Sequence, residues 1–259
     1  MFDWKVAIKN LYTLPMIFGK FPPVFQKNSE INVTSYNNIL DVTKSATNAI
    51  MGGTDNITKV KTHHQDTIVF FLNGICTDKR VWEINAKEIL QYFDFHEVLP
   101  LHNPTKGVVS DLVECVFGRN FDIEDRDTHT LYKTLRNALV GANKVIVIAH
   151  SQGGIMISQI IEHLYKESNP HMHKLEVYTF ASAACEMMKG DHYAEHYANN
   201  FDYVSRIGVL SYQYDYYGKI YERTDGYGHL LNGHYLSPFS KGHFCNGTSK
   251  LYSYIKKAT

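Results

Sequence analysis

Two continuous apolar runs stand out in the pattern of hydrophobic and polar positions along the chain. Residues 67–72 read TIVFFL and residues 144–149 read KVIVIA, and neither run alternates apolar with polar side chains. A strand with one face in water shows such alternation, whereas a strand covered on both faces of a parallel sheet reads as an unbroken apolar run. The pattern therefore predicts a parallel sheet that is buried on both sides.

Segments with helical spacing of their apolar residues separate the predicted strands. The run GIMISQIIEHLYKE follows the second strand directly and places its apolar residues along one face of a helix. Alternating strands and helices predict an α/β domain with a doubly wound, mostly parallel sheet. We predict strands at 67–72, 96–101, 144–149, 174–182, 196–204 and 218–225, and helices at 82–93, 110–117, 130–139, 154–167 and 249–258.

The first sixty residues lack this alternation. They contain the pair Pro22-Pro23 and the polar stretch NSEINVTSYNNIL. A chain of 259 residues is long enough for one large α/β domain. We therefore expect an N-terminal extension over residues 1–60 that packs on a domain over residues 61–259.

Charge and cysteine content narrow the range of partners. Lys and Arg number 26, as do Asp and Glu, so the charge balance gives no reason to expect nucleic acid as a partner. The four cysteines form no C-x-x-C pair and are interpreted as free thiols.

Asp3 and Pro15 interrupt the apolar N-terminus, which argues against a secretory signal. With no transmembrane helix predicted either, we expect a cytoplasmic protein, and peripheral membrane contact through the N-terminal segment stays open.

The stretch after the second apolar run carries the most specific motif. Residues 149–153 read Ala-His-Ser-Gln-Gly, which places Ser151 between a buried strand and an amphipathic helix. A serine on such a sharp strand-to-helix turn has a strained backbone and needs small neighbours two positions away, as in the G-x-S-x-G nucleophile elbow. Ala149 replaces the first glycine and adds only one methyl group. The motif predicts a nucleophile at Ser151, with the N–H groups of the following helix facing any developing anion.

With this elbow, the chain from about residue 67 to its C-terminus resembles the α/β-hydrolase superfamily, and in particular its lipase-like serine hydrolases. The resemblance implies the α/β-hydrolase fold and an oxyanion hole made by two backbone N–H groups. One is that of Gln152, which follows the nucleophile. The other comes from the loop NGICTD after the first strand, where Ile75 is the expected donor by position and Cys76 is the alternative.

The acid and the base of a serine triad should follow in the chain order Ser, acid, His. The segment NNFDYV is similar to the N-x-x-D-x-V segment of class 3 (fungal-type) lipases, which implies that Asp202 orients the base. Asp215 is the alternative acid. His229 comes directly after the last predicted strand and His234 follows five residues later. We favour His229 as the base and keep His234 as the second candidate.

The sequence thus predicts a serine hydrolase that cleaves a carboxylic ester through an acyl-enzyme, without a cofactor or a metal ion. The resemblance implies a small-molecule or lipid ester as the substrate.

His150, beside the nucleophile, is assigned to the packing of the elbow. The histidine clusters HHQD and NPHMHK come without a matched set of metal ligands. Two alternatives stay open: a non-catalytic hydrolase fold that serves as a binding module, and a thioesterase or acyltransferase that uses the same triad.

Overall fold

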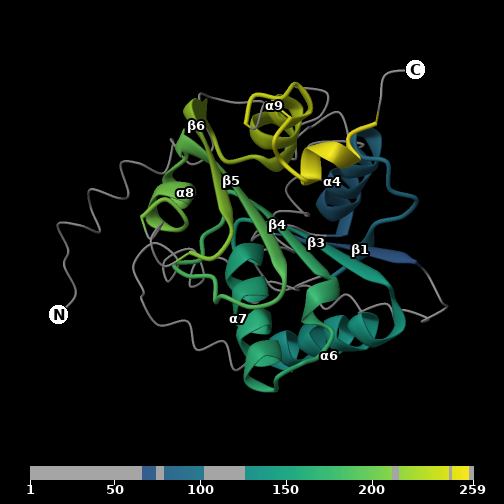
Figure 1. The fold of residues 1–259 in the computed structure, drawn as a ribbon. Coiled ribbons are helices and arrows are strands. Elements are labelled where there is room, and N and C mark those ends of the chain that lie inside the picture. Colours follow the sequence, from purple (N-terminus) through teal and green to yellow (C-terminus); the bar gives the residue numbers. More distant parts are fainter. Residues whose placement is uncertain (1–65, 74–78, 102–125, 212–215, 245–246, 257–259) are drawn as a thin grey trace, which may run out of the picture.

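A parallel β-sheet forms the centre of the computed structural model, which describes residues 66–73, 79–101, 126–211, 216–244 and 247–256. In this part of the chain the sheet has six strands, and every neighbouring pair is parallel (Figure 1). The strand order across the sheet is β2-β1-β3-β4-β5-β6. The strands are β1 (Thr67–Leu72), β2 (Leu99–Pro100), β3 (Lys144–His150), β4 (Leu175–Phe180), β5 (Tyr193–Phe201) and β6 (Lys219–Tyr227).

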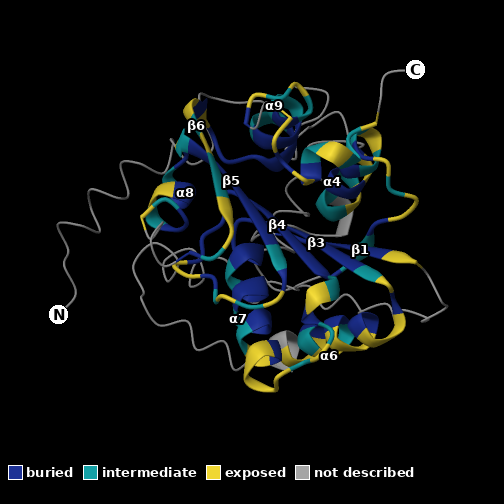
Figure 2. Cartoon of the chain, in the orientation of Figure 1, coloured by how far each residue is buried: buried dark blue, intermediate teal, exposed yellow. Residues whose placement is uncertain are grey.

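Helices cover both faces of this sheet, as the doubly wound prediction requires. α6 and α7 pack on one face, against side chains such as Phe70 and Val147, while α4 and the C-terminal helices pack on the other, against Phe71 and Ile148. Because successive side chains of a strand point to opposite faces, the apolar runs of β1 and β3 are buried on both sides (Figure 2). The helices are α4 (Lys79–Tyr92), α6 (Arg126–Gly141), α7 (Gly153–Lys166), η3 (Met172–Lys174), α8 (Tyr203–Ile207), the π-helix η5 (Leu231–Leu236), α9 (Ser237–Ser240) and η6 (Leu251–Tyr254).

The winding direction of the sheet reverses between β1 and β3. From β1 the chain passes through α4 to β2 on one side, and it then crosses back to place β3 on the other side of β1. In open α/β sheets, ligands bind beyond the carboxyl ends of the strands at such a switch point. β3 ends at His150, so Ser151 stands at this edge. A doubly wound parallel sheet with a serine elbow at its carboxyl edge is the arrangement of the α/β-hydrolase fold, as predicted.

The predicted strand over 196–204 ends earlier than expected. β5 stops at Phe201, and α8 begins two residues later. Asp202 is the cause, because its carboxylate accepts a hydrogen bond at 2.9 Å from the N–H of Val204 and so caps the helix. A polar side chain that satisfies a free helix N–H thus overrides the apolar alternation that suggested a longer strand.

Of the predicted C-terminal helix over 249–258, the described residues, which end at 256, form only the short 3₁₀-helix η6. After η6, Ile255 adopts extended geometry with ψ of 133° and pairs with Phe93 in an isolated antiparallel bridge. Before it, the Glu195 carboxylate of β5 accepts hydrogen bonds from the N–H groups of Lys250 at 2.7 Å and Leu251 at 3.1 Å. Tertiary contacts at both ends therefore outweigh the helical propensity of the segment.

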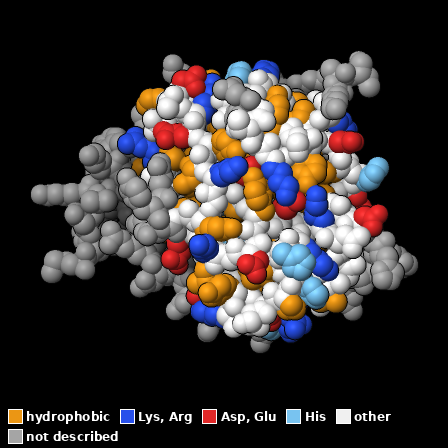
Figure 3. Space-filling model, in the orientation of Figure 1, with side chains coloured by type: hydrophobic (Ala, Val, Ile, Leu, Met, Phe, Trp, Pro, Cys, Tyr) orange, Lys and Arg blue, Asp and Glu red, His pale blue; other side chains and the backbone are white. Residues whose placement is uncertain are grey.

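Some expectations concern residues outside the described ranges, namely the N-terminal extension over 1–60 and the helix over 110–117. Among the described helices, none has the combination of length and hydrophobicity that a membrane crossing needs. Figure 3 shows Lys and Arg side chains interspersed with Asp and Glu over the face that it draws. This mixed surface agrees with the equal numbers of the two charge types in the chain.

Candidate active site

Ser151 occupies a sharp turn between β3 and α7. Its φ is +58°, in the left-handed region that residues other than glycine rarely adopt. Its backbone N–H donates to the carbonyl oxygen of Phe180 at 3.1 Å, which ties the turn to the end of β4. The turn also needs a small residue after it, because a Cβ atom on Gly153 would lie 2.5 Å from the carbonyl oxygen of Leu72. This is the geometry that the elbow motif predicts.

Ser151 is the first member of a chain of three hydrogen-bonded side chains. Its Oγ lies 2.9 Å from Nε2 of His229, and Nδ1 of His229 lies 3.0 Å from Oδ2 and 3.2 Å from Oδ1 of Asp202. All three residues are buried, and Asp202 has no exposed surface. Because an ionised carboxylate only accepts, His229 donates from Nδ1 and its Nε2 accepts from the serine hydroxyl. A histidine in this tautomer is able to take the proton of the serine.

These three side chains follow three different strands of the sheet and meet at one edge of it. Ser151 follows β3, Asp202 follows β5, and His229 lies just beyond the end of β6. Gly228, with φ of +78°, turns the chain directly before His229. Because the strands are parallel, their carboxyl ends meet at one edge of the sheet, so residues as far as 78 positions apart in sequence form hydrogen bonds there.

His150 supports the loop that carries His229. Its Nε2 lies 2.8 Å from the backbone carbonyl oxygen of His229, so this nitrogen carries the proton. Burial lowers the pKa of His150 well below its usual value, and the nearby His229 lowers it further. His150 therefore stays neutral and acts in packing, which is the role that the sequence suggested for it.

The other candidate acid and base have different surroundings. His234 accepts a hydrogen bond at Nδ1 from the N–H of Leu230 at 3.0 Å, and its ring packs against Tyr227. The structure therefore brings His229, rather than His234, to Ser151. Asp215 lies outside the described residues. Within the described ranges, no cluster of three or more His, Cys, Asp or Glu side chains is placed to hold a metal ion.

Only one of the two expected oxyanion donors belongs to the described residues. The N–H of Gln152 stands directly before α7, and among the described residues no acceptor is bonded to it. The first N–H groups of a helix lack partners within the helix and carry a partial positive charge. An unpaired N–H beside Ser151 suits a developing oxyanion. Ile75 and its alternative Cys76 lie in the segment 74–78, outside the described ranges.

Sequence reasoning missed the residues that surround Asp202. The hydroxyl of Tyr235 lies 2.6 Å from Oδ2 of Asp202, and that of Ser205 lies 3.3 Å from the same oxygen. Asn199 donates from Nδ2 to the carbonyl oxygen of Gly228 at 3.3 Å and so holds the turn before the histidine. Ser205 has a sequence signal, because it stands three residues after the cap residue, and side chains three positions apart on a helix are neighbours. Tyr235 has none, because 33 positions separate it from Asp202.

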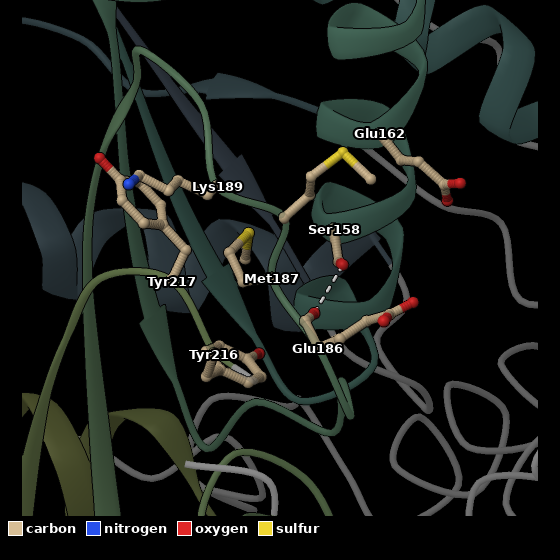
Figure 4. Close-up of a pocket in the computed structure, with 8 residues that line it drawn as sticks. Ser158, Glu162, Glu186, Met187, Lys189, Tyr216 and Tyr217 are labelled. Atoms are coloured by element: carbon tan, nitrogen blue, oxygen red, sulfur yellow. Dashed lines mark hydrogen bonds between the residues drawn. The ribbon is translucent and has the colours of Figure 1, made fainter. Parts of the chain in front are cut away.

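A hollow of about 390 Å³ lies on the flank of α7 (Figure 4). Ser158 on α7 lines one side of it, and Met187, Tyr216 and Tyr217 line the other. The hydroxyl of Tyr216 is engaged with Oγ of Ser182 at 2.7 Å. None of the three hydrogen-bonded residues at the sheet edge lines this hollow, so it is a feature separate from the candidate active site.

Comparisons with known proteins give structural likenesses only. No protein-family model matches the chain, and no curated protein matches its sequence. The chain is similar to the structure of an arylesterase, with a TM-score of 0.49 and 8% identity over 93% of this chain and 95% of that one. It is also similar to Est1E from Butyrivibrio proteoclasticus with ferulic acid bound, with a TM-score of 0.39 and 9% identity over 73% of this chain and 90% of that one. A third likeness is to a putative α/β-superfamily hydrolase from Xanthomonas campestris pv. campestris, with a TM-score of 0.35 and 11% identity over 69% of this chain and 94% of that one. At these TM-scores the likenesses carry no argument about function, which rests on the geometry of the site.

Proposed function

We propose that this protein is a serine hydrolase that cleaves carboxylic esters through an acyl-enzyme. One observation carries the proposal: the hydrogen-bonded chain from Ser151 through His229 to the buried carboxylate of Asp202, at the carboxyl edge of the sheet. This order of groups supplies a nucleophile, a base in the required tautomer, and a negative charge that stabilises the imidazolium.

Acylation begins when Oγ of Ser151 attacks the carbonyl carbon of the ester and its proton moves to Nε2 of His229. The carbonyl π electrons move to the oxygen, and the N–H of Gln152 binds the resulting negative charge, with the N–H of Ile75 as the second donor. The tetrahedral intermediate then expels the alkoxide, which takes the proton from His229 and leaves as an alcohol. Water, deprotonated by His229, hydrolyses the remaining acyl-enzyme and restores Ser151.

Asp202 supports both half-reactions without changing its own protonation. It holds His229 at Nδ1 and stabilises the positive charge that the imidazole acquires in each transfer. Because Asp202 is fully buried, water screens this interaction little. This weak screening makes one carboxylate an effective partner for the histidine.

We infer that the substrate is a lipid or other acyl ester, as in the lipase-like hydrolases that the sequence resembles. The support is the segment NNFDYV, in which the aspartate that matches the class 3 lipase pattern lies beside His229. A series of p-nitrophenyl esters with rising acyl length tests the inference. We expect kcat/KM to increase with the length of the acyl chain, and a preference for acetate would contradict a lipid-like substrate.

Labelling with a fluorophosphonate probe tests the proposed chemistry, because the probe bonds to an activated serine. We expect the wild-type protein to be labelled and to hydrolyse p-nitrophenyl esters. Ser151→Ala should abolish labelling and lower turnover by about 10⁴-fold or more. Ser158→Ala is the matched control, since its hydroxyl lies on the same helix and donates to the carbonyl oxygen of Glu186. Folded wild-type protein that takes no label would favour a non-catalytic binding module.

A further inference from the structure

Asp202 has buried hydrogen-bond partners besides His229. Tyr235 on η5 places its hydroxyl 2.6 Å from Oδ2 of Asp202, 2.9 Å from Oγ of Ser205 and 3.1 Å from the backbone nitrogen of Asn199. All four of these residues have no exposed surface. Tyr235 thus links the carboxylate to β5 and α8 in a place that bulk water does not reach.

Counting protons fixes the direction of these hydrogen bonds. The backbone N–H of Asn199 can only donate, so the oxygen of Tyr235 accepts from it. An ionised carboxylate can only accept, so the proton of Tyr235 points to Asp202. Because the one proton of Tyr235 points to Asp202, the hydroxyl of Ser205 is the donor in its contact with Tyr235. The oxygen of Tyr235 also lies nearer to Oγ of Ser205, at 2.9 Å, than Oδ2 of Asp202 does, at 3.3 Å. Tyr235 therefore donates to Asp202 while it accepts two hydrogen bonds from the other side.

We propose that Tyr235 is a positioning residue that sets how strongly Asp202 stabilises the protonated form of His229. The inference rests on the proposed function. A hydroxyl that donates to a carboxylate forms a strong hydrogen bond because the acceptor is charged. Oδ2 of Asp202 accepts from Tyr235 and is also the oxygen nearer to Nδ1 of His229. Tyr235 and His229 therefore share the negative charge of one oxygen.

The titratable groups around this cluster leave the tyrosine in its donor state. Burial raises the pKa of the Tyr235 hydroxyl well above its usual value, and the charge of Asp202 raises it further. Burial also lowers the pKa of His234 to about 4 and that of His150 well below its usual value. Both of these histidines are therefore neutral in the range where a histidine base titrates, so neither of them adds a charge beside Asp202 there.

Removal of the tyrosine hydroxyl should leave more negative charge on Asp202 for His229. The protonated form of His229 is then better stabilised, so the pKa of the base rises. The acid limb of the pH–rate profile should move to higher pH by roughly half a unit to one unit. Turnover on the plateau should fall several-fold, because the carboxylate loses one of the groups that orient it.

The test compares Tyr235→Phe with Tyr197→Phe across the pH range from about 5 to 9. Tyr197 is equally buried and also donates to a carboxylate, that of Glu195 at 2.5 Å. Tyr197→Phe therefore removes the same kind of hydrogen bond at a place outside the triad. Rates of fluorophosphonate labelling and ester hydrolysis are measured at each pH, and thermal unfolding is measured for each variant. We expect both variants to lose stability and only Tyr235→Phe to shift the acid limb.

An unshifted acid limb in folded Tyr235→Phe would overturn the role given to the tyrosine. If that variant does not fold, Ser205→Ala replaces it. Loss of the hydrogen bond from Ser205 to the tyrosine oxygen weakens the tyrosine as a donor. Ser205→Ala should therefore shift the acid limb in the same direction by a smaller amount. An unshifted limb in Ser205→Ala then overturns the inference. Folded wild-type protein that shows neither labelling nor hydrolysis overturns the proposed function itself, so the two failures are distinguishable.

Discussion

At the scale of single residues, His229 and His234 show how surroundings decide the chemistry of a side chain. His229 has a carboxylate on one ring nitrogen and a serine hydroxyl on the other. His234 instead accepts the N–H of Leu230, and burial lowers its pKa to about 4. A histidine that stays neutral and holds a backbone N–H is a structural group, although it stands only five residues from the proposed base.

Substitution of each histidine should separate these roles. We expect His229→Ala to lower ester turnover about as far as Ser151→Ala, by about 10⁴-fold or more, because the members of a triad act as a unit. His234→Ala should keep most of the turnover and lower the melting temperature, because it leaves the N–H of Leu230 without its acceptor. Hydrolysis of a p-nitrophenyl ester and thermal unfolding check both outcomes. The reverse pattern would move the base to His234.

At the scale of elements, the sequence predicts best what is decided locally. The runs TIVFFL and KVIVIA form β1 and β3, because unbroken apolar runs suit strands that are covered on both faces. Element ends were less predictable, because partners distant in sequence set some of them. Glu195, more than fifty positions before η6, binds the N–H groups at its start, and no periodicity within 249–258 reveals that contact.

The same distinction applies to the candidate site. Ser151 belongs to a local motif, and its backbone has the left-handed geometry that the motif implies. The choice between His229 and His234 needed the fold, because both follow β6 within a few residues. Tyr235 was missed for a related reason: a tyrosine among apolar residues reads as core, and only the meeting of η5 with the end of β5 brings its hydroxyl to Asp202.

The elbow itself yields a prediction about helix α7. A Cβ atom on Gly153 would lie 2.5 Å from the carbonyl oxygen of Leu72 and 3.0 Å from that of Asn73, and neither backbone atom is able to move freely. Gly153→Ala should therefore push α7 away from β1 and lower the free energy of unfolding by about 1–3 kcal/mol. Fluorophosphonate labelling should slow as well, because Ser151 lies at the same turn.

Urea unfolding of Gly153→Ala, beside a matched glycine variant, measures this effect. Gly247→Ala is the comparison, because a Cβ atom there would meet no described residue within 4 Å, while its φ of +79° still imposes backbone strain. We expect Gly247→Ala to lose about 1–2 kcal/mol from that strain and to keep its labelling rate. Equal labelling by both variants would show that close packing of the helix on β1 is not what positions Ser151.

At the scale of the whole molecule, buried titratable groups link the stability of the fold to pH. His196 on β5 is fully buried and is bonded to Oγ1 of Thr179 and to the carbonyl oxygen of Tyr217, each at 2.9 Å. His192 is almost as buried, and neither of its ring nitrogens has a hydrogen-bond partner among the described residues. Burial lowers the pKa of each to about 4, so both are neutral in the folded protein at neutral pH.

Two buried carboxylates titrate in a lower range of pH. Burial pushes the pKa of Glu176 upward, but hydrogen bonds from Lys250 and Tyr178 outweigh it and bring the pKa below its usual value. Burial acts on Glu195 in the same way and is outweighed, first of all, by the hydrogen bond from Tyr197. A carboxyl whose pKa is lowered on folding contributes stability above its unfolded pKa, 4.5 here, and loses that contribution as the pH falls through the folded value. Among these buried groups, the change in stability above about pH 4.5 therefore belongs to the histidines.

We expect the free energy of unfolding to fall as the pH is lowered from about 6.5 to about 4.5. In this range the unfolded chain binds protons at His192 and His196, and also at His150 and His234, whereas burial lowers the pKa of all four in the folded protein, so stability rises with pH. Each such histidine contributes a slope of about 1.4 kcal/mol per pH unit. His192→Leu removes one of these titrations and keeps an apolar side chain against Tyr217. Urea unfolding between these pH values should therefore give a slope smaller by about that amount. A slope equal to that of the wild-type protein would mean that His192 is protonated in the folded state or that its site is open to water. That result would contradict the account of this histidine as a buried neutral group.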